Sequence, residues 1–210
     1  MTKAERLLSV LAVCACLGTL LPLLLYFVGA FEMSASFPAV ALPSLMVLLV
    51  LAVVLRKRKV PVFWSRFAIG AAAGLLATVV YDGVRLAGLL VKFPGFEIIG
   101  KFGVLITGAA NDTPLTISVG WFYHFSNGTV FGIIYCLIAG RAPVWVAVAW
   151  GLVLEAGMLA TYPSAFGVNM GARSPGLFWS VLGHIGYGAA LGVLVRRWLP
   201  DAREVSRAAS

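Results

Sequence analysis

Residues 114–139 read PLTISVGWFYHFSNGTVFGIIYCLIA, and this stretch decides the fold of the chain. A helix rises about 1.5 Å per residue and the hydrocarbon core of a bilayer is about 30 Å thick, so roughly 20 apolar residues can cross it. The stretch exceeds that length and contains no Asp, Glu, Lys or Arg. Thr113 can cap the helix, Pro114 suits its first position, and Arg141 follows its end. We therefore predict a transmembrane helix over residues 114–139.

The rest of the sequence contains five more apolar runs that pass the same length test. The six predicted spans cover residues 7–31, 38–55, 67–90, 114–139, 143–162 and 175–195. Of the 210 residues, 61% are hydrophobic and 11% are charged, whereas globular proteins average about 45–50% and about 25%. This composition, with a mean hydropathy of +0.98, excludes a soluble enzyme and a disordered chain. We predict an all-α polytopic integral membrane protein, with one six-helix domain over residues 1–200 and a polar cytoplasmic tail over residues 201–210.

The positive charges indicate the orientation of the chain. Most of the 16 Lys and Arg residues fall on one side of the predicted membrane. They are Lys3, Arg6, Arg56, Lys57, Arg58, Lys59, Arg66, Arg141, Arg196, Arg197, Arg203 and Arg207. Only Lys92, Lys101 and Arg173 fall on the other side. Because cytoplasmic loops are enriched in Lys and Arg, we predict that both termini are cytoplasmic, in the cytoplasmic membrane of a bacterium. The same distribution explains the net charge of +8 without a nucleic-acid partner.

The connection between the third and fourth spans, residues 92–113, is too long for a tight turn. Phe96, Ile99 and Phe102 recur at helical spacing, and Glu97 and Lys101 form an i,i+4 pair on another face. This pattern predicts an amphipathic helix that lies in the outer interface of the membrane. A re-entrant lid over a cavity is the alternative.

Two spans share a motif of a histidine followed by glycines at four-residue intervals. It occurs as His124, Gly128 and Gly132, and again as His184, Gly188 and Gly192. In the preceding spans, residues 74–78 (GLLAT) resemble residues 157–161 (GMLAT). These similarities favour a parallel repeat of two hairpins, formed by spans three and four and by spans five and six. Chance recurrence is the alternative, because the chain contains 23 glycines.

The four motif glycines have two interpretations. Glycines at four-residue spacing let another helix approach closely, so Gly128, Gly132, Gly188 and Gly192 are predicted to be helix-packing residues. A groove for a cofactor is the other interpretation.

Ionisable residues from four spans fall at similar depths. Counting about 1.5 Å per residue places Asp82, His124, Glu155 and His184 between about 8 and 15 Å below the outer surface, with Arg85 nearer the interface. Side chains in or near this layer that can hydrogen-bond are Asn127, Tyr81, Tyr123 and Tyr187. Charged groups in a membrane cost at least about 2.5–3.5 kcal/mol and normally face a bundle interior or a cavity. We therefore predict an intramembrane polar site formed by His124, His184, Glu155, Asp82, Arg85 and Asn127.

The partners within this layer follow from charge and spacing. Asp82 and Arg85 are three residues apart on one helix and can neutralise each other. Glu155 has no such partner in its own span, so we expect it to be protonated or paired with His124 or His184, because desolvation favours the neutral acid.

Three functions fit the layer. In the first, the protein is a non-catalytic accessory or assembly subunit, in which hydrogen bonds between helices explain the polar groups. In the second, it is a transporter or permease with a proton-titrating site formed by His and Glu. In the third, it is a redox protein that binds haem or a metal. The sequence contains only two histidines and no HExxH or GxSxG motif, so we expect no catalytic residues and define no cofactor or metal. The expected partners are the lipid bilayer and a second copy of the chain or a larger membrane complex.

Overall fold

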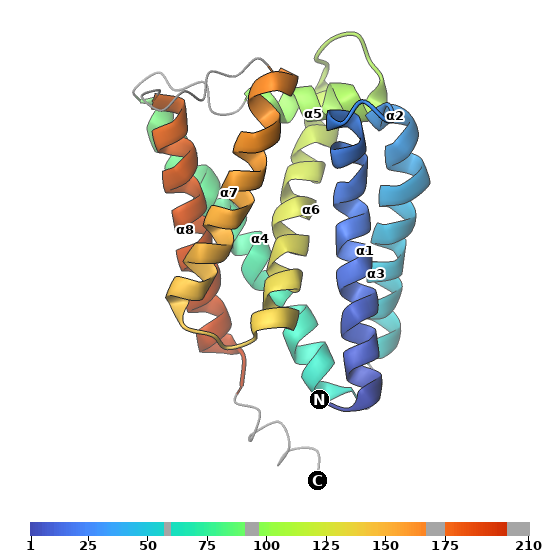
Figure 1. The fold of residues 1–210 in the computed structure, drawn as a ribbon, viewed down its shortest axis with the longest axis vertical. Helices are drawn as coiled ribbons and strands as arrows, with labels where there is room; N and C mark the ends of the chain where they lie inside the picture. The colour runs from blue at the N-terminus through green and yellow to red at the C-terminus, as the bar shows by residue number, and fades with distance from the viewer. Residues whose placement is uncertain (57–59, 91–96, 167–174, 201–210) are drawn as a thin grey trace.

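The computed structural model describes residues 1–56, 60–90, 97–166 and 175–200, and all regular structure in them is helical (Figure 1). The helices are α1 (Lys3–Phe27), α2 (Met33–Ser36), η1 (Phe37–Ala41, a π-helix), α3 (Leu42–Leu55), α4 (Pro61–Leu89), α5 (Glu97–Thr107), α6 (Pro114–Ala139), α7 (Val144–Phe166) and α8 (Pro175–Trp198). By length and composition, six helices within these described ranges can cross a membrane, because α2, η1 and α3 form one continuous span. The prediction of an all-helical chain with six such spans is confirmed. The predicted tail, residues 201–210, lies outside the described residues.

The ends of the helices follow local signals rather than the ends of the apolar runs. Helix α6 has the predicted bounds, because Thr113 caps its first turn and Gly140, with a φ of 57°, ends it. Helix α1 begins at Lys3 instead of residue 7, since Thr2 and Glu5 form a capping box. The same helix stops at Phe27, before the predicted residue 31.

Helix α4 begins at Pro61 instead of the predicted residue 67. Proline suits the first turn of a helix. The carboxylate of Glu5 also accepts hydrogen bonds from the free N–H groups of Val62 and Phe63, at 3.0 and 3.3 Å. Glu5 therefore caps the start of two helices.

Helix α4 organises the bundle. It runs obliquely behind the other helices and packs against both α6 and α8, while α7 packs against α8 (Figure 1). Helices α1 and α3 lie on the other side of α6. The short helix α5 packs against α6 and lies across the end of the bundle where α6 begins. The predicted orientation places this end outside, and we call it the outer end.

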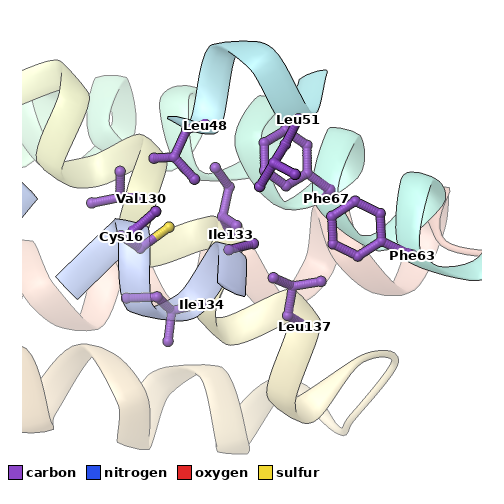
Figure 2. Packing of buried hydrophobic residues seen from close by; sticks show 11 residues of the cluster. Cys16, Leu48, Leu51, Phe63, Phe67, Val130, Ile133, Ile134 and Leu137 are labelled. Carbon is purple, nitrogen blue, oxygen red and sulfur yellow. The ribbon is translucent and has the colours of Figure 1, made fainter. Parts of the chain in front are cut away.

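Three clusters of buried apolar side chains hold the helices together. The first lies between α1, α3, α4 and α6 and contains Cys16, Leu48, Phe67 and Ile133 (Figure 2). The second joins α4, α6, α7 and α8, and the third joins α1, α2, η1, α5 and α6 below the outer end.

Glycines let the helices of the second cluster approach closely. A Cβ atom on Gly74 of α4 would lie 2.5 Å from the carbonyl oxygen of Gly128 and 2.9 Å from Cα of Gly132. On the other hairpin, a Cβ atom on Gly188 would lie 2.7 Å from Cα of Val148. Contacts this short leave no room for a side chain, so backbone packs directly against backbone.

Candidate functional site

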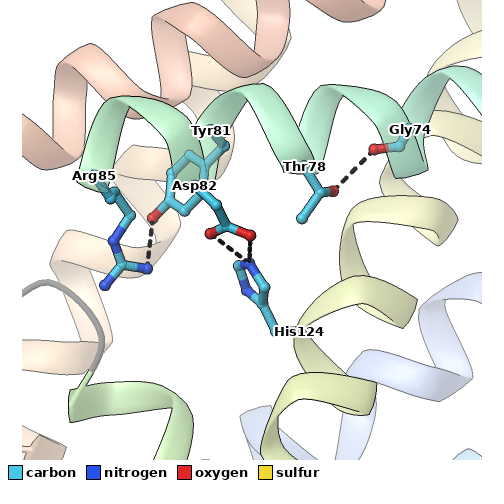
Figure 3. Close-up of polar contacts among 6 residues, drawn as sticks. All are labelled: Gly74, Thr78, Tyr81, Asp82, Arg85 and His124. Atoms are coloured by element: carbon cyan, nitrogen blue, oxygen red, sulfur yellow. Dashed lines mark hydrogen bonds and ion pairs between the residues drawn. The ribbon is translucent and has the colours of Figure 1, made fainter. Parts of the chain in front are cut away.

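The first acid–histidine pair joins α4 to α6. Nε2 of His124 lies 2.9 Å from Oδ1 and 3.1 Å from Oδ2 of Asp82 (Figure 3). Each of the two side chains is 14% exposed. One ring nitrogen therefore faces both carboxylate oxygens at an interhelical contact that is largely dry.

The second acid–histidine pair joins α7 to α8. Nδ1 of His184 lies 2.7 Å from Oε2 of Glu155. Ser180, one turn before His184, donates its hydroxyl to the same carboxylate oxygen at 2.9 Å, and its carbonyl oxygen lies 3.0 Å from Nδ1. Because both of the atoms facing Nδ1 are oxygen acceptors, we infer that Nδ1 carries a hydrogen. The Glu155 side chain is only 3% exposed, so this pair is the more deeply buried of the two.

Tyr81 lies between the two pairs. Its ring centroid is 4.9 Å from that of His184, in an edge-on arrangement, and 5.9 Å from that of His124. A Cβ atom on Gly183 would be 2.9 Å from the Tyr81 ring, so only glycine lets the ring sit this close to α8. Arg85 places its guanidinium 5.2 Å from the ring centroid and donates to the Tyr81 hydroxyl at 3.4 Å (Figure 3).

Four of the six predicted site residues thus form two pairs on either side of Tyr81. Glu155 is paired with His184, one of the two partners expected for it. Asp82 is paired with His124. Within the described ranges, no group of three or more His, Cys, Asp or Glu side chains is placed to hold a metal ion.

Asn127 lies on α6 in the part of the chain that the structure describes. No hydrogen bond there joins Asn127 to either acid–histidine pair, and its buried Oδ1 atom has no partner among the described residues.

The contacts of the two hairpins follow one register. In the first hairpin, α4 meets α6 where Thr78 contacts Gly128 and where Gly74 contacts Gly132. In the second hairpin, α7 meets α8 at the corresponding places, where Gly151 contacts Gly188 and where Ala147 contacts Gly192. Asp82 bonds to His124 as Glu155 bonds to His184. The same number of residues separates Thr78 from Gly151, Gly74 from Ala147 and Asp82 from Glu155. Three different contacts therefore match α4 with α7 in a single alignment.

This register differs from the one that the sequence similarity suggests. The similarity of residues 74–78 to residues 157–161 would match Gly74 with Gly157. Gly74 lies in the close contact with α6, whereas a Cβ atom on Gly157 would meet no described atom within 4 Å. The two segments therefore occupy different environments.

Two further residues of the site are Ser180, which was not predicted, and Tyr187, which was predicted to lie in or near the layer but without its partner. Ser180 sits one turn before His184, a spacing that places the two on one face, but a single serine in an apolar helix is common. Tyr187 donates its hydroxyl to the carbonyl oxygen of Gly128 at 2.8 Å, across the contact between the hairpins. That bond depends on how α8 meets α6, which no local pattern encodes.

The sequence matches no protein-family model, and the chain has no significant match among curated proteins or among solved structures.

Proposed function

We propose that this chain is a non-catalytic accessory or assembly subunit of a bacterial cytoplasmic membrane, with both termini in the cytoplasm. The observation that carries the proposal is that each histidine is already bonded to a carboxylate of a neighbouring helix. In this function the two pairs fix which helices meet and in what register. A polar group in hydrocarbon must find its partner inside the protein, so a mismatched packing would leave charges unpaired.

The matched contact register supports a parallel duplication of the α4–α6 and α7–α8 hairpins. In this proposal Asp82–His124 and Glu155–His184 are equivalent pairs related by an axis along the membrane normal. Tyr81 of the first hairpin packs on α8, and Tyr187 of the second hairpin bonds to α6. Both tyrosines then serve to join the two copies.

Large apolar side chains are exposed on the outward faces of α3 and α7, which supports the proposal that lipid or other protein surrounds the bundle. Met46, Leu49 and Val53 of α3 are each more than 60% exposed, as are Trp145 and Val153 of α7. In the proposed assembly these faces contact acyl chains or the helices of a second copy or of a larger complex. Helix α5 then rests in the outer interface, as its position across the outer end allows.

The assembly function is tested by the size of the native particle. We would extract the tagged full-length chain from its own membrane in a mild detergent and measure the protein mass of the particle without its bound detergent. We expect that protein mass to exceed the 22.3 kDa of the monomer. The variants His124→Gln and Glu155→Gln keep a hydrogen-bonding side chain at each pair and should preserve that size. A particle that is monomeric in every mild detergent and in nanodiscs would contradict the proposal.

Proton-coupled transport is the second candidate, and one atom favours it. The Oε1 atom of Glu155 is buried and has no hydrogen-bond partner among the described residues. A buried acid with a free oxygen can take up and release a proton. In proteoliposomes that contain a pH-sensitive dye, transport predicts a proton flux that Glu155→Gln abolishes, whereas assembly alone predicts the same flux for Glu155→Gln and wild type.

A further inference from the structure

A cleft opens at the outer end of the bundle, where the end of α1 meets α5 and the segment that connects α5 to α6 (Figure 1). Its volume is about 430 Å³, and small-molecule sites typically measure about 300–1,000 Å³. Among the described residues that line this outer cleft, none belongs to either acid–histidine pair. The residues that matter below are Tyr26 of α1, Lys101, Val104 and Leu105 of α5, and Asn111 and Asp112 of the connecting segment.

The connecting segment is held at both of its ends. Gly108 follows α5 in the left-handed region, with a φ of 69°, and the hydroxyl of Thr107 accepts a hydrogen bond from the N–H of Ala109 at 3.3 Å. At the other end, Thr113 caps α6. Local hydrogen bonds therefore fix the wall of the outer cleft that Asn111 and Asp112 provide.

Opposite charges line neighbouring parts of the outer cleft. A Cβ atom on Gly100 would lie 3.0 Å from Oδ1 and 3.2 Å from Oδ2 of Asp112, so the carboxylate rests on the backbone of α5. Lys101 is the next residue of that helix. Lys101 and Asp112 are exposed, whereas Val104 and Leu105 are half-buried. The outer cleft thus has a charged rim and an apolar floor.

We propose that the outer cleft binds a phospholipid whose headgroup carries both a phosphate and a primary ammonium, as that of phosphatidylethanolamine does. Lys101 contacts the phosphate, while the Asp112 carboxylate and the Asn111 amide oxygen accept hydrogen bonds from the ammonium. The glycerol and the first carbons of the acyl chains lie on Val104 and Leu105. A headgroup without an amine would bring a negative charge towards Asp112 with no compensating contact.

The position of the outer cleft favours a lipid over a soluble ligand. Helix α5 lies across the end of the bundle that the proposed orientation places in the membrane interface, which is the layer of the lipid headgroups. Tyr26 and Leu105 pack against the third apolar cluster, so the floor continues into the apolar interior. The inference rests on the proposed orientation only for the leaflet that supplies the lipid, and it does not require the assembly function.

Headgroup selectivity can be measured by native mass spectrometry of the purified full chain. The probes are three lipids with the same short acyl chains, namely dihexanoyl phosphatidylethanolamine, phosphatidylcholine and phosphatidylglycerol. The first two have the same net charge, but the trimethylammonium of choline has no N–H to donate to Asp112. We expect the ethanolamine lipid to bind several-fold more tightly than either of the others. Equal affinities for the three lipids would overturn the proposal.

Matched charge deletions test the acidic side of the outer cleft. Asp112→Asn should weaken the ethanolamine lipid several-fold and abolish its advantage over the choline lipid. Glu32→Gln is the control, because Glu32 is also an exposed acid next to α2 at the outer end but does not line the outer cleft. This control should change neither affinity. If the two variants behave alike, Asp112 does not recognise the headgroup and the proposal fails.

The basic side is tested in the same way. Lys101→Gln should weaken all three lipids several-fold, because each carries a phosphate, and Lys101→Arg should restore most of the loss. Unchanged affinities in Lys101→Gln would contradict a phosphate contact at this residue.

Free phosphoethanolamine separates a lipid from a soluble ligand with the same charged groups. It cannot cover Val104 and Leu105, so we expect it to displace the bound ethanolamine lipid only at concentrations at least several-fold above that of the lipid. Displacement at equal concentrations would assign the outer cleft to a soluble ligand and overturn the lipid proposal.

Discussion

The loss of unfolding free energy on mutating the Glu155–His184 contact can tell whether the contact is an ion pair or a neutral hydrogen bond. In Glu155→Ala, His184 and Ser180 both lose the carboxylate oxygen that they contact at 2.7 and 2.9 Å. Removing one partner of a buried ion pair destabilises a protein by about 3–5 kcal/mol. In Glu155→Gln an amide oxygen can still accept from both groups, so the loss should stay below about 1.5 kcal/mol if the contact is a neutral hydrogen bond.

A double-mutant cycle isolates the contact itself. We would measure the free energy of unfolding by reversible SDS titration for Glu155→Ala, His184→Ala and the double variant. Interhelical hydrogen bonds in membrane proteins give coupling energies that average about 0.6 kcal/mol, with a maximum near 1.7. A coupling above that maximum indicates an ion pair, and a coupling within it indicates a neutral hydrogen bond. We expect a coupling in the upper part of this range or above it, because the Glu155 side chain is only 3% exposed and the contact is little screened.

The Asp82–His124 pair is the internal control. Both of its side chains are 14% exposed, so more screening should give the Asp82→Ala and His124→Ala cycle a smaller coupling than the Glu155–His184 cycle. If both cycles give a coupling near zero, the reasoning that these pairs hold the helices together is refuted.

Three further changes test the packing and the caps. Gly132→Leu should strongly destabilise the bundle, because its Cβ atom would lie 2.5 Å from Cα of Gly74 and overpacking typically costs about 1–3 kcal/mol or more. As the control in the same SDS titration, Gly157→Ala should be tolerated, because a Cβ atom there meets no described atom within 4 Å. Glu5→Ala should lower the free energy of unfolding by about 2 kcal/mol, because it removes the acceptor for the N–H groups of Thr2, Val62 and Phe63. Glu5→Gln should recover part of that loss. Equal stability of the wild type and both variants would contradict the double cap. Tyr187→Phe should lose about 0.5–1.5 kcal/mol, the value of its bond to the Gly128 carbonyl, and a stability unchanged within error would show that this bond contributes nothing.

The sequence predicts the helices well, because hydrocarbon requires long apolar runs and leaves few alternatives. It is most accurate for α6, where Thr113 and Pro114 mark the start and Arg141 follows the end. Helices α1 and α4 begin before the predicted spans, at Lys3 and Pro61. The reason is that Glu5 accepts hydrogen bonds from N–H groups at both starts and that Pro61 suits the first turn of α4. The TxxE capping box at Thr2 is a readable signal for the first start. The bond from Glu5 to residues 62 and 63 is a contact between distant segments and has no local signature.

The polar layer was partly predictable for a similar reason. Counting residues from the span ends finds Asp82, His124, Glu155 and His184 at related depths, because helical rise is constant. Depth does not determine which helix faces which, so the sequence left Glu155 with two possible histidine partners. The choice of His184 follows from the packing of α7 on α8 through Gly151 and Gly188.

The double cap at Glu5 has a consequence for biogenesis. Residues 62 and 63 leave the ribosome long after residue 5, so the Glu5 carboxylate lacks these two partners while the rest of α1 and the span formed by α2, η1 and α3 are synthesised. The capping box of α1 can form at once within residues 2–5, but the bonds of Glu5 to Val62 and Phe63 form only after α4 has been made. A bulky fusion partner attached directly to Met1 would sterically hinder the contact of Glu5 with Val62 and Phe63. An affinity tag for this protein is therefore better placed after residue 200.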